Sequence, residues 1–221
     1  MKKIIIIIIS IYLLIFCSAA KAVENSYEYK LGTAYATDPN KWGWQVDFVY
    51  YYEFDPYVVV GLEPGIYWLN WERKVGEEQQ GNVTVDVKAD SNAYMLPLMV
   101  NGQIRLPNVR NKLNFLPHIS LGLGYSFMIY NYKQPEYVNS ASGLTIESKN
   151  DTKMYSGLTW QFMVGGTFKP GQESNIGFVI ELGYRSAKVQ KGNLEIDMTS
   201  YIINAGVRYP FGGLRNGGMT I

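Results

Sequence analysis

The alternation of apolar and polar residues is the clearest signal in the chain, and it is plainest between Tyr201 and Phe211. Every odd position of this stretch is apolar or aromatic, while Asn204, Gly206 and Arg208 stand at even positions. Successive side chains of a strand point to opposite faces, so one face of this strand is apolar and the other polar. About ten tilted residues cross the core of a bilayer, and a sheet does so only when it closes without free edges. The pattern therefore predicts the closing strand of a transmembrane β-barrel.

Seven further segments show the same alternation. We expect strands at 27–36, 43–54, 58–68, 94–105, 116–130, 158–168 and 176–185. No stretch keeps a helical period, and the first strands are joined by short turns that give a meander rather than a βαβ unit. Residues 23–211 are therefore predicted to form an all-β, eight-stranded antiparallel up-and-down transmembrane β-barrel.

The connections between these strands alternate in length. Compact turns follow the second, fourth and sixth strands, whereas two polar connections are long, at Glu72–Asp90 and Lys133–Lys153. This matches short periplasmic turns and longer outer loops, with residues 82–88 able to extend the strands beyond the membrane. Loops on a rigid scaffold are common binding sites, so loops 72–90 and 133–153 are the expected contacts for an extracellular ligand.

Aromatic residues gather near the expected ends of the strands. Amphipathic rings favour the two water interfaces of a membrane, so we expect two aromatic girdles. The outer girdle is predicted at Trp42, Trp44, Trp68 and Trp71, and the inner rim at Tyr52, Phe54, Tyr57, Phe168, Tyr209 and Phe211.

The N-terminus has the pattern of a secretory signal peptide. Lys2 and Lys3 precede an apolar run, and Ala20-Lys21-Ala22 supplies a small-x-small cleavage site, so residues 1–22 are expected to be removed. The run is too short for a spanning helix, so an uncleaved anchor is the weaker alternative. A lipobox that ends at Cys17 is also a weaker alternative. Residues 212–221 are expected to form a short periplasmic tail.

Charge and composition narrow the function classes. After cleavage the chain keeps 17 basic and 19 acidic residues, so it has no basic surface for nucleic acid. Cys17 leaves with the signal and His118 is the only histidine, which removes disulfides, thiolate metal sites and most zinc or triad chemistry. His118 and Ser120 share a face, but no third group is in place to orient them. We expect no cofactor, no metal and no catalytic site.

The polar faces of the predicted strands would line the lumen. Eight strands make a barrel just wide enough for its own side chains to fill, and isolated charges there would be costly. We therefore expect acids and bases to pair into a plug formed by Lys30, Asp47, Glu53, Glu63, Arg105, Glu181, Arg185 and Arg208. Two alternatives stay open: conduction of protons or ions along this network, and a soluble lipocalin-type barrel in which the apolar face points inward.

Two motifs carry a family resemblance. Asn204-x-Gly206-x-x-Tyr209-x-Phe211 resembles the signal that bacterial outer-membrane barrels present to their assembly machinery. Pro117-His118-Ile119 leading into Gly122-Leu123-Gly124-Tyr125 is similar to the fifth strand of the small eight-stranded family of OmpA-like, OmpW-like and opacity-type proteins. The resemblance implies an outer-membrane location with lipid and the barrel assembly machinery as partners. It implies a non-enzymatic role, either surface display or a narrow channel for ions or small apolar solutes.

Overall fold

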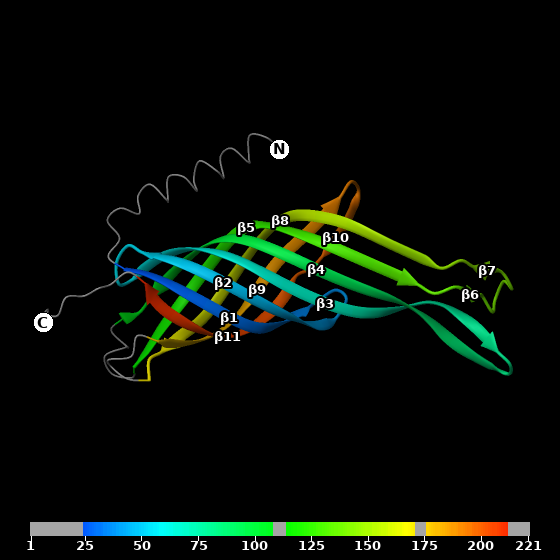
Figure 1. Ribbon diagram of the computed structural model, residues 1–221, viewed down its shortest axis with the longest axis horizontal. Coiled ribbons are helices and arrows are strands. Elements are labelled where there is room, and N and C mark those ends of the chain that lie inside the picture. The colour runs from blue at the N-terminus through cyan, green and yellow to red at the C-terminus, as the bar shows by residue number, and fades with distance from the viewer. Residues whose placement is uncertain (1–23, 108–113, 171–175, 212–221) are drawn as a thin grey trace, which may run out of the picture.

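The computed structural model describes residues 24–107, 114–170 and 176–211, and most of them lie in antiparallel strands that wrap into one tube (Figure 1). The expected signal peptide and the expected periplasmic tail lie outside the described residues. Within the described part of the chain, no helix is long and apolar enough to cross a membrane. The strands are β1 (Glu24–Ala36), β2 (Lys41–Glu53), β3 (Val58–Gln80), β4 (Val83–Arg105), β5 (Phe115–Gln134), β6 (Tyr137–Val138), β7 (Thr145–Ile146), β8 (Lys149–Phe168), β9 (Gly177–Lys191), β10 (Leu194–Asp197) and β11 (Ser200–Phe211).

Strand pairing closes the sheet into a ring. The pairs run in the order β1, β2, β3, β4, β5, β8, β9 and β11, and β11 pairs back onto β1. Strand β10 pairs with β9 in the register that β11 continues, since Asp197 faces Lys188 and Ser200 faces Arg185. It is therefore the outer end of the last strand, interrupted only at residues 198–199. The predicted eight-stranded antiparallel barrel is confirmed.

The two faces of the wall are oriented as the alternation predicts. Val46, Leu121 and Ile180 on the outer face are 53%, 50% and 64% exposed, whereas Asp47 and Glu181 on the inner face are 1% and 0% exposed. The apolar rows therefore meet lipid and the polar rows meet each other. The lipocalin-type alternative, which needs the opposite orientation, is wrong.

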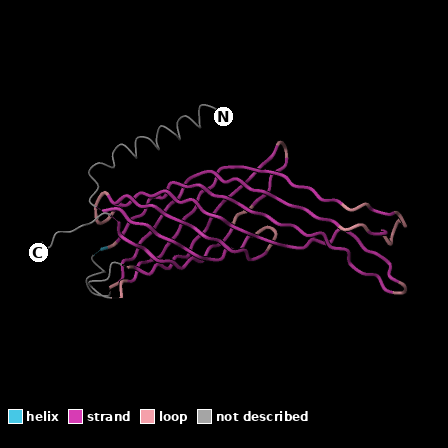
Figure 2. Tube along the Cα trace, in the orientation of Figure 1, coloured by secondary structure: helices cyan, strands magenta, loops and turns pink. Residues whose placement is uncertain are grey.

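The strands differ greatly in length, and this corrects the prediction of two long outer loops. Strands β3 and β4 have 23 residues each, while β1 and β2 have 13. Pairing of β3 with β4 continues to Gln80 and Val83, so most of 72–90 is a hairpin with a tight turn at Gly81, where φ is +63°. Pairing of β5 with β8 likewise continues to Gln134 and Lys149, so only part of 133–153 is loop (Figure 2).

The polarity of these segments caused the error. Val83 and Val85 keep a strand alternation, but Thr84 and Asp86 between them and Gln80 and Glu78 opposite them are polar or charged, because both faces meet water near the tip. Opposite charges across the strands pair there, as Lys88 does with Glu72 at 2.8 Å. Such cross-strand pairs support a sheet in which most side chains are polar.

The tips of the two long hairpins are joined. Residues 139 and 78 form an isolated bridge, and the Ser140 amide donates to the Glu77 carbonyl at 2.8 Å. The Tyr137 hydroxyl donates to the Val75 carbonyl at 3.1 Å, and its ring covers Gly76 at a place where any β-carbon would overlap it. Beyond the membrane, β3, β4, β5 and β8 thus form one connected outer extension, on one side of the barrel mouth only (Figures 1 and 2).

Candidate functional site

Lys30 lies at the centre of the lumen, surrounded by carboxylates. Its Nζ is 2.8 Å from Glu63, 3.0 Å from Glu181 and 3.8 Å from Glu28, and none of these side chains is more than 1% exposed. A buried ammonium in such a place compensates several buried carboxylates at once. Gly206, which pairs with Lys30 across the β1–β11 ladder, leaves room for its aliphatic stem.

The remaining oxygens of this cluster contact polar side chains from β4, β5 and β8. Glu63 accepts hydrogen bonds from Asn101 at 2.5 Å and from Gln161 at 2.8 Å. Glu181 lies 2.8 Å from Nε2 of His118. These contacts link β3 to β4 and β8, and β9 to β5, through side chains that point into the lumen.

A second layer lies on the outer side of Lys30. Arg185 donates to Gln161 at 3.0 Å and to Gln45 at 3.3 Å, and its guanidinium is 3.9 Å from Asp47. Gln45 in turn donates to Asp47 at 2.8 Å and to Asn204 at 2.7 Å. Asn204, expected to be part of the assembly signal, therefore also belongs to the lumen network.

A third layer closes the inner end. Arg208 pairs with Glu28 at 2.5 Å, and Arg105 pairs with Glu53 at 2.8 Å. Both guanidinium groups also face the buried ring of Tyr51, at 5.0 Å for Arg208 and 5.9 Å for Arg105. Cation–π contacts of this kind stabilise charges that have lost water.

The structure brings all eight predicted network residues onto the lumen face and links them by these contacts. The prediction missed Glu28, His118 and the neutral amides. Glu28 stands two positions before Lys30, so the two-residue period alone could have found it. The amides could not be found in the same way, because their roles depend on which strands face each other across the barrel.

The outer half of the lumen differs from the charged half. A cluster of buried apolar side chains fills it, which the sequence reasoning did not foresee. Met95, Met128 and Met198 lie in it with Tyr67 and Leu69. Methionine adapts to irregular spaces, which suits a cluster built from several strands. Charged side chains thus line one part of the lumen, and buried apolar side chains pack in another.

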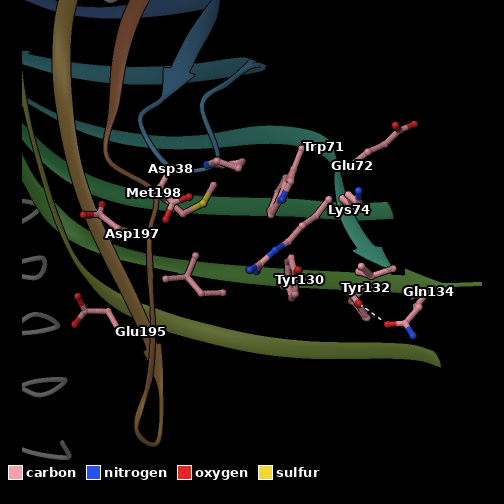
Figure 3. A pocket seen from close by; sticks show the side chains of 14 residues that line it. Asp38, Trp71, Glu72, Lys74, Tyr130, Tyr132, Gln134, Glu195, Asp197 and Met198 are labelled. Carbon is pink, nitrogen blue, oxygen red and sulfur yellow. Dashed lines mark hydrogen bonds between the residues drawn. The ribbon is translucent and has the colours of Figure 1, made fainter. Parts of the chain in front are cut away.

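An open pocket of about 840 Å³ lies above this apolar cluster, at the outer mouth (Figure 3). Its floor is formed by Trp71, Tyr130, Ile196 and Met198, which pack on or belong to the cluster below. The rings of Trp71 and Tyr130 are stacked with centroids 5.7 Å apart. The rest of its wall is mostly polar and comprises Asp38, Pro39, Glu72, Arg73, Lys74, Val75, Tyr132, Gln134, Glu195 and Asp197.

Trp71 therefore does not belong to the lipid-facing girdle, and its assignment there is wrong. It is three positions from Trp68, so the two residues lie on opposite faces of β3. Trp42, Trp44 and Trp68 are exposed on the outer face, and Trp68 stacks with Tyr94. At the inner rim, Phe54 is exposed and Tyr52 lies against it, while Tyr209 is on the same outward face as the rest of the apolar row.

Charged pairs shape the rim of the pocket. The Lys88 ammonium donates to Glu72 and holds the pKa of that carboxyl below its ordinary value. The Asp86 and Glu77 carboxylates raise the pKa of Lys74, which lies within 2.7 Å of Asp86. These pairs fix the geometry of the β3–β4 hairpin, although each exposed pair adds little to stability.

His118 and Ser120 make no hydrogen bond to each other. His118 faces Glu181 instead, and both His118 and Ser120 are 1% exposed on the lumen side of the wall.

Comparison with known proteins agrees with this architecture. The family model described as outer membrane protein beta-barrel domain matches residues 8–211. The chain belongs to this family. Its location is therefore the bacterial outer membrane, as the resemblance predicted.

Several solved structures resemble this outer membrane β-barrel protein. A major outer membrane protein from Thermus thermophilus is 13% identical with a TM-score of 0.49, covering 85% of this chain and 99% of that one. Neisserial surface protein A is 13% identical with a TM-score of 0.46, covering 84% and 95%. OprG from Pseudomonas aeruginosa is 12% identical with a TM-score of 0.45, covering 88% and 99%. No curated protein matches the sequence.

Proposed function

We propose that this protein is a non-conducting, non-enzymatic outer-membrane barrel that displays a rigid outer extension for extracellular binding, in adhesion, surface recognition or envelope integrity. The single observation that carries the proposal is the combination of a filled lumen with strands that run far beyond the membrane on one side.

The filled lumen argues against transport. Paired charges and buried apolar side chains both point into the lumen, and all of the charged residues but Glu53 are almost fully buried. Moving an ion through them would require breaking several buried pairs, each of which costs about 3–5 kcal/mol to disrupt.

The outer extension argues for binding. The last residue of β3 that pairs with β2 is Trp68, yet β3 continues to Gln80. At about 3.3 Å per residue, this is roughly 40 Å of additional strand. Strands without a lipid face or a lumen to enclose do not serve the barrel, and the tip contacts of Tyr137 keep them in a fixed shape.

Planar-bilayer recording tests the proposal. The purified barrel should give no steady conductance, whereas a variant with Lys30, Glu63 and Arg185 all replaced by alanine should conduct because three large side chains leave the lumen. A large steady current through the unaltered protein would overturn the non-conducting part of the proposal.

A narrow channel for small apolar solutes is the second candidate. It is favoured by one observation, the continuity of the outer pocket with the methionine-rich cluster through Met198. Uptake of a small apolar solute into liposomes that contain the barrel would support it. The display function is supported if the barrel gives neither conductance nor solute uptake. It also requires that surface binding is lost when residues 75–86 are replaced by a short turn.

A further inference from the structure

The pocket at the outer mouth has the size and position of a small-ligand site. Asp38 and Pro39 of the β1–β2 turn line it on one side, and residues of β3 and β5 line it on the other (Figure 3). Its volume of about 840 Å³ falls in the range of roughly 300–1,000 Å³ that ligand pockets have. Because it lies at the mouth, a water-soluble ligand can reach it from the outside.

The floor of the pocket is a preformed aromatic surface. The rings of Trp71 and Tyr130 are stacked, with an interplanar angle of 28°. The Tyr130 hydroxyl lies 3.0 Å from the Ser91 hydroxyl, and the Tyr130 ring packs in a T-shaped arrangement against Tyr155 with centroids 6.3 Å apart. These contacts hold the two rings in place before a ligand arrives, so little conformational freedom is lost on binding.

The charged side chains around the floor fall into two sets. Glu72, Glu195 and Lys74 are already in ion pairs with other side chains of the protein. In contrast, the side chains of Arg73 and Asp38 form no ion pair or hydrogen bond with any residue that the structure describes. The pocket therefore offers a ligand one strong donor group and one strong acceptor group.

Asp197 and Gln134 each use one side-chain atom within the protein. Oδ1 of Asp197 accepts a hydrogen bond from the Thr199 amide at 2.9 Å, and Oε1 of Gln134 accepts one from the Tyr132 hydroxyl at 2.7 Å. In the described part of the chain, the other oxygen of Asp197 and the amide nitrogen of Gln134 have no protein partner. Acceptors thus come from the β1–β2 turn and β10, and donors come from β3 and β5.

This combination matches a neutral saccharide better than other small ligands. A sugar ring has a face of C–H groups that packs on an aromatic ring, and its hydroxyl groups both donate and accept hydrogen bonds. An anionic ligand would leave Asp38 and Asp197 without partners, and a cationic ligand would leave Arg73 without one. An apolar solute would cover all three polar groups without pairing them, which costs free energy.

We propose that the pocket binds a neutral saccharide carried by another surface. One sugar ring packs on the Trp71–Tyr130 surface, with its hydroxyl groups between Asp38 and Asp197 on one side and Arg73 on the other (Figure 3). The carboxylates accept hydrogen bonds from sugar hydroxyls, and the guanidinium donates to a hydroxyl or ring oxygen. The inference rests on the proposed display function, for which it names the class of ligand.

Saturation-transfer NMR on the barrel in phospholipid nanodiscs tests this. The probes are four neutral tetrasaccharides, built from glucose, galactose, mannose and N-acetylglucosamine. We expect at least one of them to bind, with the strongest transfer to the C–H protons on one face of a single ring. Its sulfated derivative should bind more weakly by roughly tenfold or more, because the sulfate groups would lie near unpaired carboxylates.

Substitutions on the two faces of β3 form a matched pair. Trp71→Leu keeps an apolar floor but removes the stacking ring, so it should weaken binding by roughly tenfold or more. Trp68→Leu, on the lipid-facing side of the same strand, should leave binding unchanged. Trp71→Phe keeps an aromatic face and should recover much of the binding, and Arg73→Ala should weaken it because a donor is lost.

Nanodiscs that also contain lipopolysaccharide identify the source of the sugar. We expect no competition with the free tetrasaccharide, because the pocket lies inside the mouth of the barrel and away from the lipid-facing rows. Competition would overturn the recognition of another surface and assign the pocket to sugars of the protein's own membrane.

The outcomes separate this inference from the proposed function. Absence of binding by all four probes, equal signals from empty nanodiscs, unchanged binding in Trp71→Leu, or stronger binding of the sulfated derivative would each overturn the saccharide site. None of these results would produce conductance. The display function is therefore judged by the bilayer recording and by the replacement of residues 75–86.

Discussion

The lumen network makes one prediction whose size follows from the geometry. Replacing Lys30 with methionine keeps most of the side-chain volume but removes the ammonium that lies 2.8 Å from Glu63, 3.0 Å from Glu181 and 3.8 Å from Glu28. Removing one partner of a buried ion pair costs about 3–5 kcal/mol, and here one cation serves three carboxylates. We expect the free energy of unfolding to fall by at least ~3 kcal/mol, which is more than a hundredfold in the folding equilibrium.

Reversible denaturant unfolding in lipid vesicles, followed by tryptophan fluorescence, measures this loss. Lys88→Met is the matched control, because Lys88 also pairs with a glutamate at 2.8 Å but is 57% exposed, and it should have no measurable effect. The loss in Lys30→Met should shrink at acidic pH, since a protonated carboxyl no longer needs a counter-charge.

A second substitution makes the reasoning refutable. Adding Glu63→Gln to Lys30→Met removes one of the uncompensated charges and should recover part of the stability. If the single variant is as stable as the Lys88→Met control, or if the double variant is less stable than the single one, then Lys30 does not compensate the charge of these carboxylates.

Three further predictions follow from the fold. Gly124→Ala should destabilise the barrel by about 1–3 kcal/mol in the same unfolding assay, because the added β-carbon would overlap the backbone of the neighbouring strand β4. Gly102→Ala is the control and should be neutral, because its added β-carbon would have only one atom nearby, an oxygen at 3.9 Å. In single-tryptophan variants, a brominated lipid should quench Trp68 but not Trp71, and an aqueous quencher should reach Trp71 more readily; the reverse would contradict the assignment of faces. NMR titration should show the pKa of the Glu72 carboxyl below its ordinary value, and the pKa should return towards that value in Lys88→Met. The contribution of this pair to the free energy of unfolding is therefore full above the ordinary carboxyl pKa and is lost as pH falls through the lowered pKa.

The two-residue alternation of the sequence was enough to place most side chains on the correct face. Val46 faces lipid and Asp47 faces the lumen because neighbouring positions of a strand always point in opposite directions, and only one of them tolerates hydrocarbon. The same rule applies to Trp71. It is three positions from Trp68, which already places it on the lumen face, and its assignment to the girdle did not take this spacing into account.

Only the tertiary structure decided how far each strand runs and which residues meet across the tube. Glu72–Asp90 is rich in charged and polar residues, so its composition does not distinguish a loop from a hairpin; pairing with a neighbouring strand does. The contact of Gln161 with Glu63 and the pocket beside the β1–β2 turn likewise arise from the stagger of strands around a closed ring. Alternation is a local property of one strand, whereas stagger is set by all the pairings together, and for that reason the sequence determined the faces and the fold determined the site.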